Sequence, residues 1–131
     1  MALLLAPFFI ACSQPKPLSE HMSPLPPSGA IDRGIHRLPA RVYFEDTDTA
    51  GIMYHAKYLH FMERARSDML ACVGIDQRTV HAAGQGAYAV TQMHIKYRRP
   101  AHFDDALVVI STVEAVRAAS CDIHQTVMRG D

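Results

Sequence analysis

The sequence predicts an α+β protein in which one long helix lies on an antiparallel sheet. Residues 56–73 repeat apolar side chains every three or four positions, which is typical of an amphipathic helix. The stretches 87–97, 106–116 and 120–129 alternate between apolar and polar side chains or are rich in β-branched residues, as strands are. A helix followed by three such stretches indicates a helix packed on a meander of strands.

A first strand is expected before the helix, over Arg41 to Asp46, because RVYFED combines β-branched and aromatic residues. The following TDTAGIM contains Gly51 and small polar residues, and we expect it to be a loop. Gly74 stands where a glycine commonly ends a helix. The apolar stripe of the helix consists of Tyr58, Met62, Ala65, Met69 and Cys72.

Residues 1–40 differ in composition from the rest of the chain. An apolar run over 2–11 ends at Cys12 and precedes a Pro- and Ser-rich stretch without periodicity. No Lys or Arg comes before that run, although a signal peptide normally carries one. We therefore expect 1–40 to be a disordered leader or a misassigned extension, with export as the alternative if 1–12 is a true signal. Residues 41–131 are expected to form the single domain.

The composition excludes several classes of function. Thirteen basic and thirteen acidic residues give a net charge of zero, so there is no electrostatic reason to expect nucleic-acid binding. No apolar run reaches the roughly 20 residues that span a bilayer. Three distant cysteines form no CxxC pair, which favours a reducing cytoplasm over disulfides or a zinc motif. We expect Cys72 and Cys121 to be buried apolar side chains.

The densest polar cluster is EDTD, residues 45–48, just before Gly51 and the predicted helix. Alternation along an extended chain would put Asp46 and Asp48 on one side. The free N–H groups of a helix N-terminus bind the oxygen of a polarised carbonyl, while a neighbouring carboxylate attacks or activates water. His55 adds a titratable donor near the helix start. The alternative is that the Asp and Thr side chains only cap the turn.

Residues 42–70, VYFEDTDTAGIMYHAKYLHFMERARSDML, resemble the signature of the hotdog-fold acyl-CoA thioesterases of the 4-hydroxybenzoyl-CoA thioesterase superfamily. The likeness is to the Tol-Pal-associated, YbgC-type branch, which reads aromatic-E-D-T-D-x-x-G-apolar-apolar-Y-H-x-x-Y and then E-R-A-R. The later YRRPAHFDDAL resembles the connection between strands in that family. The resemblance implies an antiparallel sheet wrapped around one long helix. It also implies cytoplasmic hydrolysis of acyl-CoA, or of an acyl carrier protein thioester, by a homodimer or tetramer without a metal or other cofactor.

The resemblance also implies roles for individual residues. Asp48 matches the catalytic aspartate, acting as nucleophile on the thioester carbonyl or as general base for water. His55 matches the residue whose backbone N–H polarises the thioester oxygen, and its side chain would orient water or protonate the leaving thiolate. Gly51 would let the loop approach the substrate, and Tyr43 and Tyr54 would shape the pocket.

Further residues leave alternatives open. The basic pair Arg98 and Arg99, close to Lys96, is either a solvated strand end or a contact for the phosphates of coenzyme A. Glu63 is expected to pair with a neighbouring arginine rather than to be a second catalytic carboxylate. Lys57 replaces the asparagine common in the branch and would either weaken local capping or add charge near the pocket mouth.

The resemblance also leaves the activity of this exact chain open. The branch continues with further strands, so we expect this chain to lack the last ones. A non-catalytic hotdog module that binds an acyl thioester or a protein, or an inactive fragment, is therefore the alternative to an enzyme.

Two other motif matches are rejected. DTDTAG has Ala50 and Lys57 at the fifth and twelfth positions of a calcium loop, where carboxylate ligands are needed. GQGAYA, residues 84–89, precedes a predicted strand and opens no helix, unlike a dinucleotide-binding turn. The histidines follow no metal-ligand spacing, so the sequence predicts no metal site.

Overall fold

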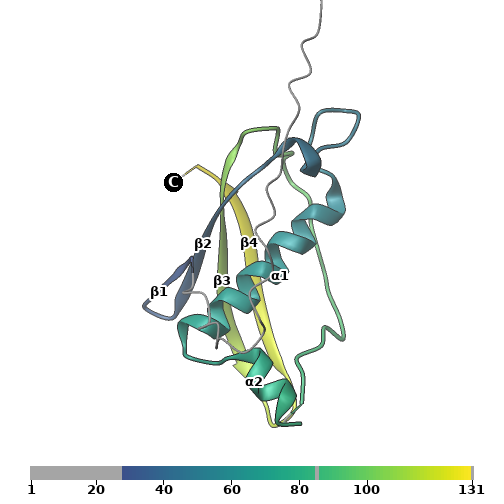
Figure 1. The fold of residues 1–131 in the computed structure, drawn as a ribbon. Coiled ribbons are helices and arrows are strands. Elements are labelled where there is room, and N and C mark those ends of the chain that lie inside the picture. The colour runs from purple at the N-terminus through teal and green to yellow at the C-terminus, as the bar shows by residue number, and fades with distance from the viewer. Residues whose placement is uncertain (1–27, 85, 131) are drawn as a thin grey trace, which may run out of the picture.

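A four-stranded antiparallel sheet carries one long helix across its face in the computed structural model, which describes residues 28–84 and 86–130 (Figure 1). The strands lie side by side in the order β1-β2-β3-β4, and the helix, α1, packs against them. This arrangement confirms the predicted α+β class. The elements are β1 (Ala30–Asp32), β2 (Ile35–Arg41), a 3-10 turn (Phe44–Asp46), α1 (His55–Cys72), α2 (Gln77–Ala82), β3 (Ala106–Val116) and β4 (Cys121–Arg129).

The core lies between α1 and the inner face of the sheet. Tyr58 and Ala65 of the predicted apolar stripe are buried, as is Phe61, which the predicted stripe did not include. Leu38 on β2 and Val109 on β3 meet them from the sheet. The other members of the predicted stripe are half-buried, namely Met62, Met69 and Cys72. The outer side of α1 is polar, and no helix within residues 28–84 and 86–130 is long and apolar enough to cross a membrane.

The predicted helix and the last two predicted strands are confirmed to within one residue at each end. Gly74 ends the helix as expected: its φ of +79° is left-handed, and its N–H donates to the carbonyl of Ala71 at 3.0 Å. Strands β3 and β4 pair from Leu107 with Arg129 to Val116 with Cys121, with one register shift on the way. These elements could be predicted because each has an unbroken local period.

The predicted first strand over 41–46 is wrong. The strand β2 ends at Arg41, where the predicted one was to begin, and residues 44–46 form a 3-10 turn. The turn closes because the Asp46 carboxylate accepts the backbone N–H of Tyr43 at 2.9 Å. Strands β1 and β2 also lie inside the segment 1–40 that was assigned to a leader, so that boundary is corrected; residues 1–27 lie outside the described residues.

The predicted strand over 87–97 is also wrong for the described chain. This segment is extended but is not assigned to any strand, and all of its residues are exposed. It runs from the α2 end of the molecule back past α1 (Figure 1). A strand needs a neighbour for its backbone hydrogen bonds, and no strand of the described residues pairs with it. The segment has the alternating side-chain pattern of a strand, but no neighbouring strand of the described residues forms backbone hydrogen bonds with it.

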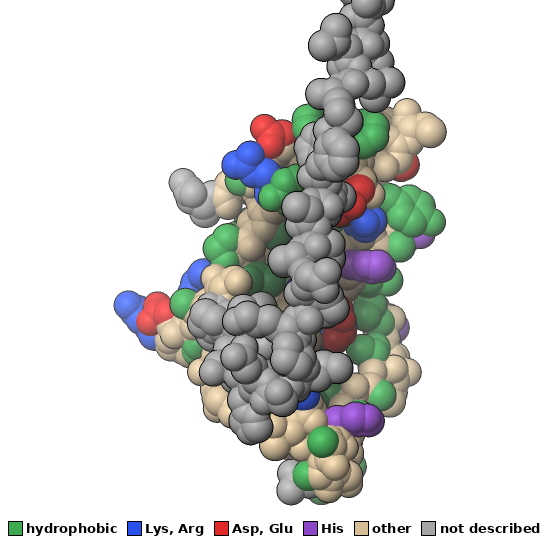
Figure 2. All heavy atoms as spheres, in the orientation of Figure 1, with side chains coloured by type: hydrophobic (Ala, Val, Ile, Leu, Met, Phe, Trp, Pro, Cys, Tyr) green, Lys and Arg blue, Asp and Glu red, His purple; other side chains and the backbone are tan. Residues whose placement is uncertain are grey.

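Charged side chains of both signs are interspersed over the visible surface rather than gathered in one patch (Figure 2). This distribution agrees with the net charge of zero. On the face shown, the described residues form no continuous basic patch of the kind that a nucleic-acid backbone requires.

Candidate active site

A short hairpin-like loop connects the 3-10 turn to the start of α1. The N–H of Asp48 donates to the carbonyl of Ile52 at 2.9 Å, and the N–H of Gly51 donates back to the carbonyl of Asp48 at 3.0 Å. Gly51 has a φ of +75°, a conformation that side-chain-bearing residues rarely adopt. The glycine therefore lets the chain reverse at this point and return toward the helix.

The loop is anchored to the segment that precedes β3. The N–H of Met53 donates to the carbonyl of Ala101 at 2.8 Å, and the N–H of Ala101 donates to the hydroxyl of Tyr58 at 3.0 Å. Ile52 also forms a β-bridge with His102. Because Tyr58 lies in the first turns of α1, these contacts fix the loop relative to the helix N-terminus.

Asp46 is a buried structural carboxylate. It is 3% exposed, and besides Tyr43 it binds the ammonium group of Lys57, with Nζ 3.1 Å from Oδ1. Its backbone carbonyl accepts the N–H of Tyr54 at 2.8 Å. Asp46 therefore joins the 3-10 turn to the first turn of α1. The expectation that Asp46 and Asp48 lie on the same side of the chain is wrong, because the chain turns between them. Lys57 forms an ion pair with Asp46 rather than only adding charge near a pocket mouth.

Asp48 is exposed and lies in the loop between the 3-10 turn and α1. Its Oδ1 accepts the N–H of Ala50 at 2.8 Å, which is the hydrogen bond of an Asx turn. The capping role considered from sequence is thus present. It orients the carboxylate without burying it, so the side chain remains open to water and to a small molecule.

His55 is the first residue of α1, directly after the N-cap residue Tyr54. Its backbone N–H belongs to the first turn, where N–H groups have no acceptor within the helix. Its ring lies 4.4 Å from the ring of Tyr54, and its carbonyl accepts the hydroxyl of Tyr97 at 3.1 Å. Asp48 and His55, both in the described part of the chain, make no direct hydrogen bond with each other.

Tyr97 also lies at this site, although from the sequence it has no role beyond opening the YRRPAHFDDAL motif. Its ring meets the edge of His55 at 6.4 Å and of Tyr58 at 5.6 Å between ring centroids. Arg98 and Arg99 follow Tyr97 directly in the sequence. Both arginines are exposed, and neither forms an ion pair within residues 28–84 and 86–130.

The remaining candidates lie around the same loop or on the outer face of α1. Tyr43 and Tyr54 are exposed, at 61% and 46% of their surface. Glu63 binds the guanidinium of Arg66 one turn further on, which confirms the expected pairing with a neighbouring arginine. Cys121 is exposed, so the expectation that it is buried is wrong, and Cys72 is only half-buried.

One helix laid on an antiparallel sheet, with a carboxylate-bearing loop leading into the helix N-terminus, defines a hotdog-fold protein. A family model described as the thioesterase superfamily matches residues 50–131, and the chain belongs to this superfamily.

Named relatives agree with this assignment. The chain is 41% identical to the acyl-CoA thioesterase YbgC of Haemophilus influenzae, over 76% of this chain and 72% of that protein. It is 36% identical to the acyl-CoA thioester hydrolase YbgC of Escherichia coli O6:H1, over 74% of this chain and 72% of that one. The crystal structure of a probable thioesterase from Bartonella henselae superimposes with a TM-score of 0.69 at 33% identity, covering 74% of this chain and 81% of the other.

Proposed function

We propose that this protein hydrolyses acyl-CoA to a carboxylic acid and free coenzyme A. The observation that carries the proposal is the exposed Asp48 carboxylate, oriented by its hydrogen bond from Ala50 in a loop that leads directly into α1. Relatives that carry the names acyl-CoA thioesterase and acyl-CoA thioester hydrolase support the substrate class.

The local geometry suits thioester hydrolysis. The backbone N–H of His55 and the positive end of the α1 dipole would stabilise negative charge on the carbonyl oxygen as it develops. Asp48 would take a proton from water as the new C–O bond forms at the carbonyl carbon, or would attack that carbon itself to form an acyl-Asp48 anhydride that water then hydrolyses. The C–S bond then breaks, and the thiolate takes a proton from the His55 imidazole or from solvent.

The surrounding residues would bind the rest of the substrate. Arg98 and Arg99 suit the phosphates of coenzyme A because guanidinium groups bind phosphate in a bidentate manner. Tyr43 and Tyr54 would line the entrance for the acyl group or the pantetheine arm. The same residues would bind an acyl carrier protein thioester, because its phosphopantetheine arm is the one that coenzyme A carries.

We further propose a cytoplasmic homodimer, or a tetramer of two such dimers. The exposed apolar side chains of Met93, Ile95 and Tyr97 repeat every second residue on the extended segment 87–97, and a second copy of this chain would cover them. The free thiols of Cys72 and Cys121 suit a reducing compartment.

The test of the hydrolase is release of free thiol from short, long and aromatic acyl-CoAs by the chain and by its Asp48→Asn variant. We expect turnover with at least one class and a fall of more than tenfold in the variant, or about 1.4 kcal/mol of lost transition-state stabilisation. Asp122→Asn is the matched control, because Asp122 is an exposed carboxylate on β4, and it should leave turnover unchanged.

Two results would contradict the proposal. One is full turnover by Asp48→Asn, which would remove Asp48 from the chemistry. The other is binding of acyl-CoA by the unmodified chain without any turnover, which would favour an acyl-thioester-binding module.

A further inference from the structure

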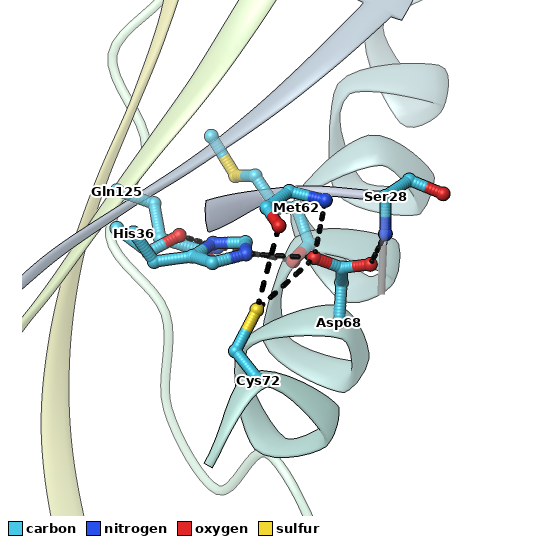
Figure 3. Close-up of polar contacts among 8 residues, drawn as sticks. Ser28, His36, Met62, Asp68, Cys72 and Gln125 are labelled. Carbon is cyan, nitrogen blue, oxygen red and sulfur yellow. Dashed lines mark hydrogen bonds and ion pairs between the residues drawn. The ribbon is translucent and has the colours of Figure 1, made fainter. Parts of the chain in front are cut away.

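A second cluster of reactive side chains lies at the other end of α1, about 20 Å along the helix axis from His55 at 1.5 Å per residue. His36 reaches it from β2, and Asp68 and Cys72 reach it from α1, where they are one helical turn apart (Figure 3). None of these residues has a part in the proposed hydrolysis. The three positions share no local motif, so their spacing in the sequence does not indicate a metal site.

The ligand-capable atoms of this cluster converge. Nε2 of His36 lies 2.8 Å from Oδ2 of Asp68, and Sγ of Cys72 lies 3.8 Å from the same oxygen. One such atom from each residue lies within 4.8 Å of the other two. Ligands around one zinc ion, each about 2.0 to 2.3 Å from it, are separated by about 3 to 4 Å. Movements of less than about 1 Å would therefore bring the three atoms around a common centre.

The backbone around the cluster leaves room for close approach only because residue 29 is a glycine. A Cβ at Gly29 would stand 2.6 Å from Oδ2 of Asp68 and 2.7 Å from Nε2 of His36. The carbonyl of Gly29 lies 3.6 Å from Sγ of Cys72. The His36 side chain is fully buried and that of Asp68 is nearly so, while Cys72 is half-buried. The cluster is thus closed on the β2 side and open toward Cys72.

Asp68 is held as a carboxylate by its hydrogen-bond partners. Burial alone would raise the pKa of Asp68, but hydrogen bonds from His36 and from the N–H groups of Ser28 and Gly29 outweigh it and hold that pKa below its ordinary value. Burial and the nearby Asp68 carboxylate raise the pKa of the Cys72 thiol.

We propose that His36, Asp68 and Cys72 bind a divalent transition-metal ion of the Zn²⁺ type, with the fourth coordination position open to water. A mixed set of imidazole nitrogen, carboxylate oxygen and thiolate sulfur is one that Zn²⁺ accepts. Two anionic ligands balance the charge of the ion. Binding displaces the thiol proton of Cys72 and places the ring proton of His36 on Nδ1, which leaves Nε2 free to bind the metal, so one proton is released to solvent. Its effect is to join β2 to the C-terminal half of α1.

The alternative is that the hydrogen bonds of Asp68 alone hold the helix to β2. Cys72 separates the two cases. The hydrogen bonds from His36, Ser28 and Gly29 to Asp68 do not involve the thiol, which has only long contacts of 3.6 and 3.8 Å. A metal site needs the sulfur as a ligand, whereas the hydrogen-bonded arrangement does not.

The test is titration of the full-length chain with Co²⁺, a spectroscopic probe for Zn²⁺ sites, after treatment with a chelator. A Cys12→Ser/Cys121→Ser background leaves Cys72 as the single thiol. We expect one Co²⁺ per chain, a thiolate-to-cobalt charge-transfer absorption, and displacement of Co²⁺ by Zn²⁺. Adding Cys72→Ser should abolish the absorption and weaken Zn²⁺ binding at least tenfold.

Two controls keep the result interpretable. His81→Ala changes a histidine on α2 that lies outside the cluster, and it should leave the absorption unchanged. Zn²⁺ should also raise the thermal unfolding midpoint of the background chain but not of Cys72→Ser. The metal site is rejected if the folded chain gives no charge-transfer absorption, or if the absorption or the Zn²⁺ affinity survives Cys72→Ser. Because Asp48 is not involved, either result leaves the hydrolase test unaffected.

Discussion

Asp46 and Asp48 are two residues apart and have opposite surroundings. Asp46 is buried, and it is held by the N–H of Tyr43 and the ammonium group of Lys57. Asp48 is exposed and has one oxygen in a turn with Ala50. A buried carboxylate with a full set of partners stabilises the loop, whereas an exposed and oriented one is available for chemistry. The difference arises from the 3-10 turn, which rotates the chain between them.

The Lys57→Met substitution tests the structural role of the buried carboxylate. Removing the ammonium group leaves Asp46 without its ion-pair partner, while the methionine keeps much of the apolar stem. We expect a loss of about 1 to 3 kcal/mol in the free energy of unfolding, less than for a fully buried pair because the Lys57 side chain is 28% exposed. Urea unfolding measures the change. Lys57→Arg, which keeps the charge, should lose much less; equal losses in both variants would contradict the ion-pair explanation.

At the scale of elements, the start of α1 is held by the segment before β3 as well as by its own loop. Tyr58 is 9% exposed, and its hydroxyl accepts the N–H of Ala101, which is itself buried. The contact joins parts of the chain that are far apart in sequence. The hydrogen bond therefore fixes the N-terminal end of α1, where His55 lies, relative to the segment before β3.

We expect Tyr58→Phe to destabilise the protein by about 1 to 3 kcal/mol, because the buried N–H of Ala101 loses its acceptor. Chemical denaturation gives the value, and hydrogen exchange of the Ala101 amide should quicken with it. Tyr88→Phe removes the same hydroxyl from a side chain that is 65% exposed and should be neutral. An unchanged Tyr58→Phe stability would show that water replaces the lost acceptor.

Elements with an unbroken local period could be predicted from sequence. The helix and the strands over 106–116 and 121–129 each carry such a period and were found where expected. Strand β2 was missed because Pro39 and the neighbouring Arg and His residues hide the buried alternation of His36, Leu38 and Ala40. The segment 87–97 has a strand-like pattern, but strand formation depends on a partner, which local sequence does not specify.

The candidate site divides in the same way. Asp48, Gly51 and His55 follow one another along a single loop, so a motif could place them together. Tyr97 joins them only through tertiary contact, as its hydroxyl bonds to His55. The cluster of His36, Asp68 and Cys72 depends on how β2 crosses α1, and no local spacing encodes that crossing.

At the scale of the whole molecule, the segment 87–97 stands out because all of its residues are exposed and it pairs with no strand among the described residues. Met93, Ile95 and Tyr97 are exposed by 43%, 37% and 51%, on alternate positions of an extended chain. Apolar side chains in such a row are typical of a surface that another chain covers. In the proposed homo-oligomer, a second copy of this chain packs against these apolar side chains.

Analytical ultracentrifugation tests this surface. We expect the unmodified chain to sediment as a dimer or larger and Met93→Lys to shift it toward the monomer, because a charge would enter the apolar contact. Gln92→Lys adds the same charge at the neighbouring position, whose side chain points to the other side of an extended chain, and should associate as the unmodified chain does. A monomer at all concentrations, or equal weakening by both substitutions, would contradict the assignment of the surface.

The pairing of β2 with β3 has a consequence for the order in which the protein acquires its structure. Strands β3 and β4 are joined by a short turn, so their pairing has a small loop-closure entropy cost. The pairing of β2 with β3 instead joins distant residues, from Arg41 with Ala106 to Ile35 with Thr112. Closing that pairing encloses about seventy residues, which contain all of α1 and the loop that carries Asp48. The carboxylate and the helix N-terminus are thus brought into register late, after the hairpin that supports them. Ribosomal synthesis reinforces this order, because β2 emerges long before its partner exists and must wait for it.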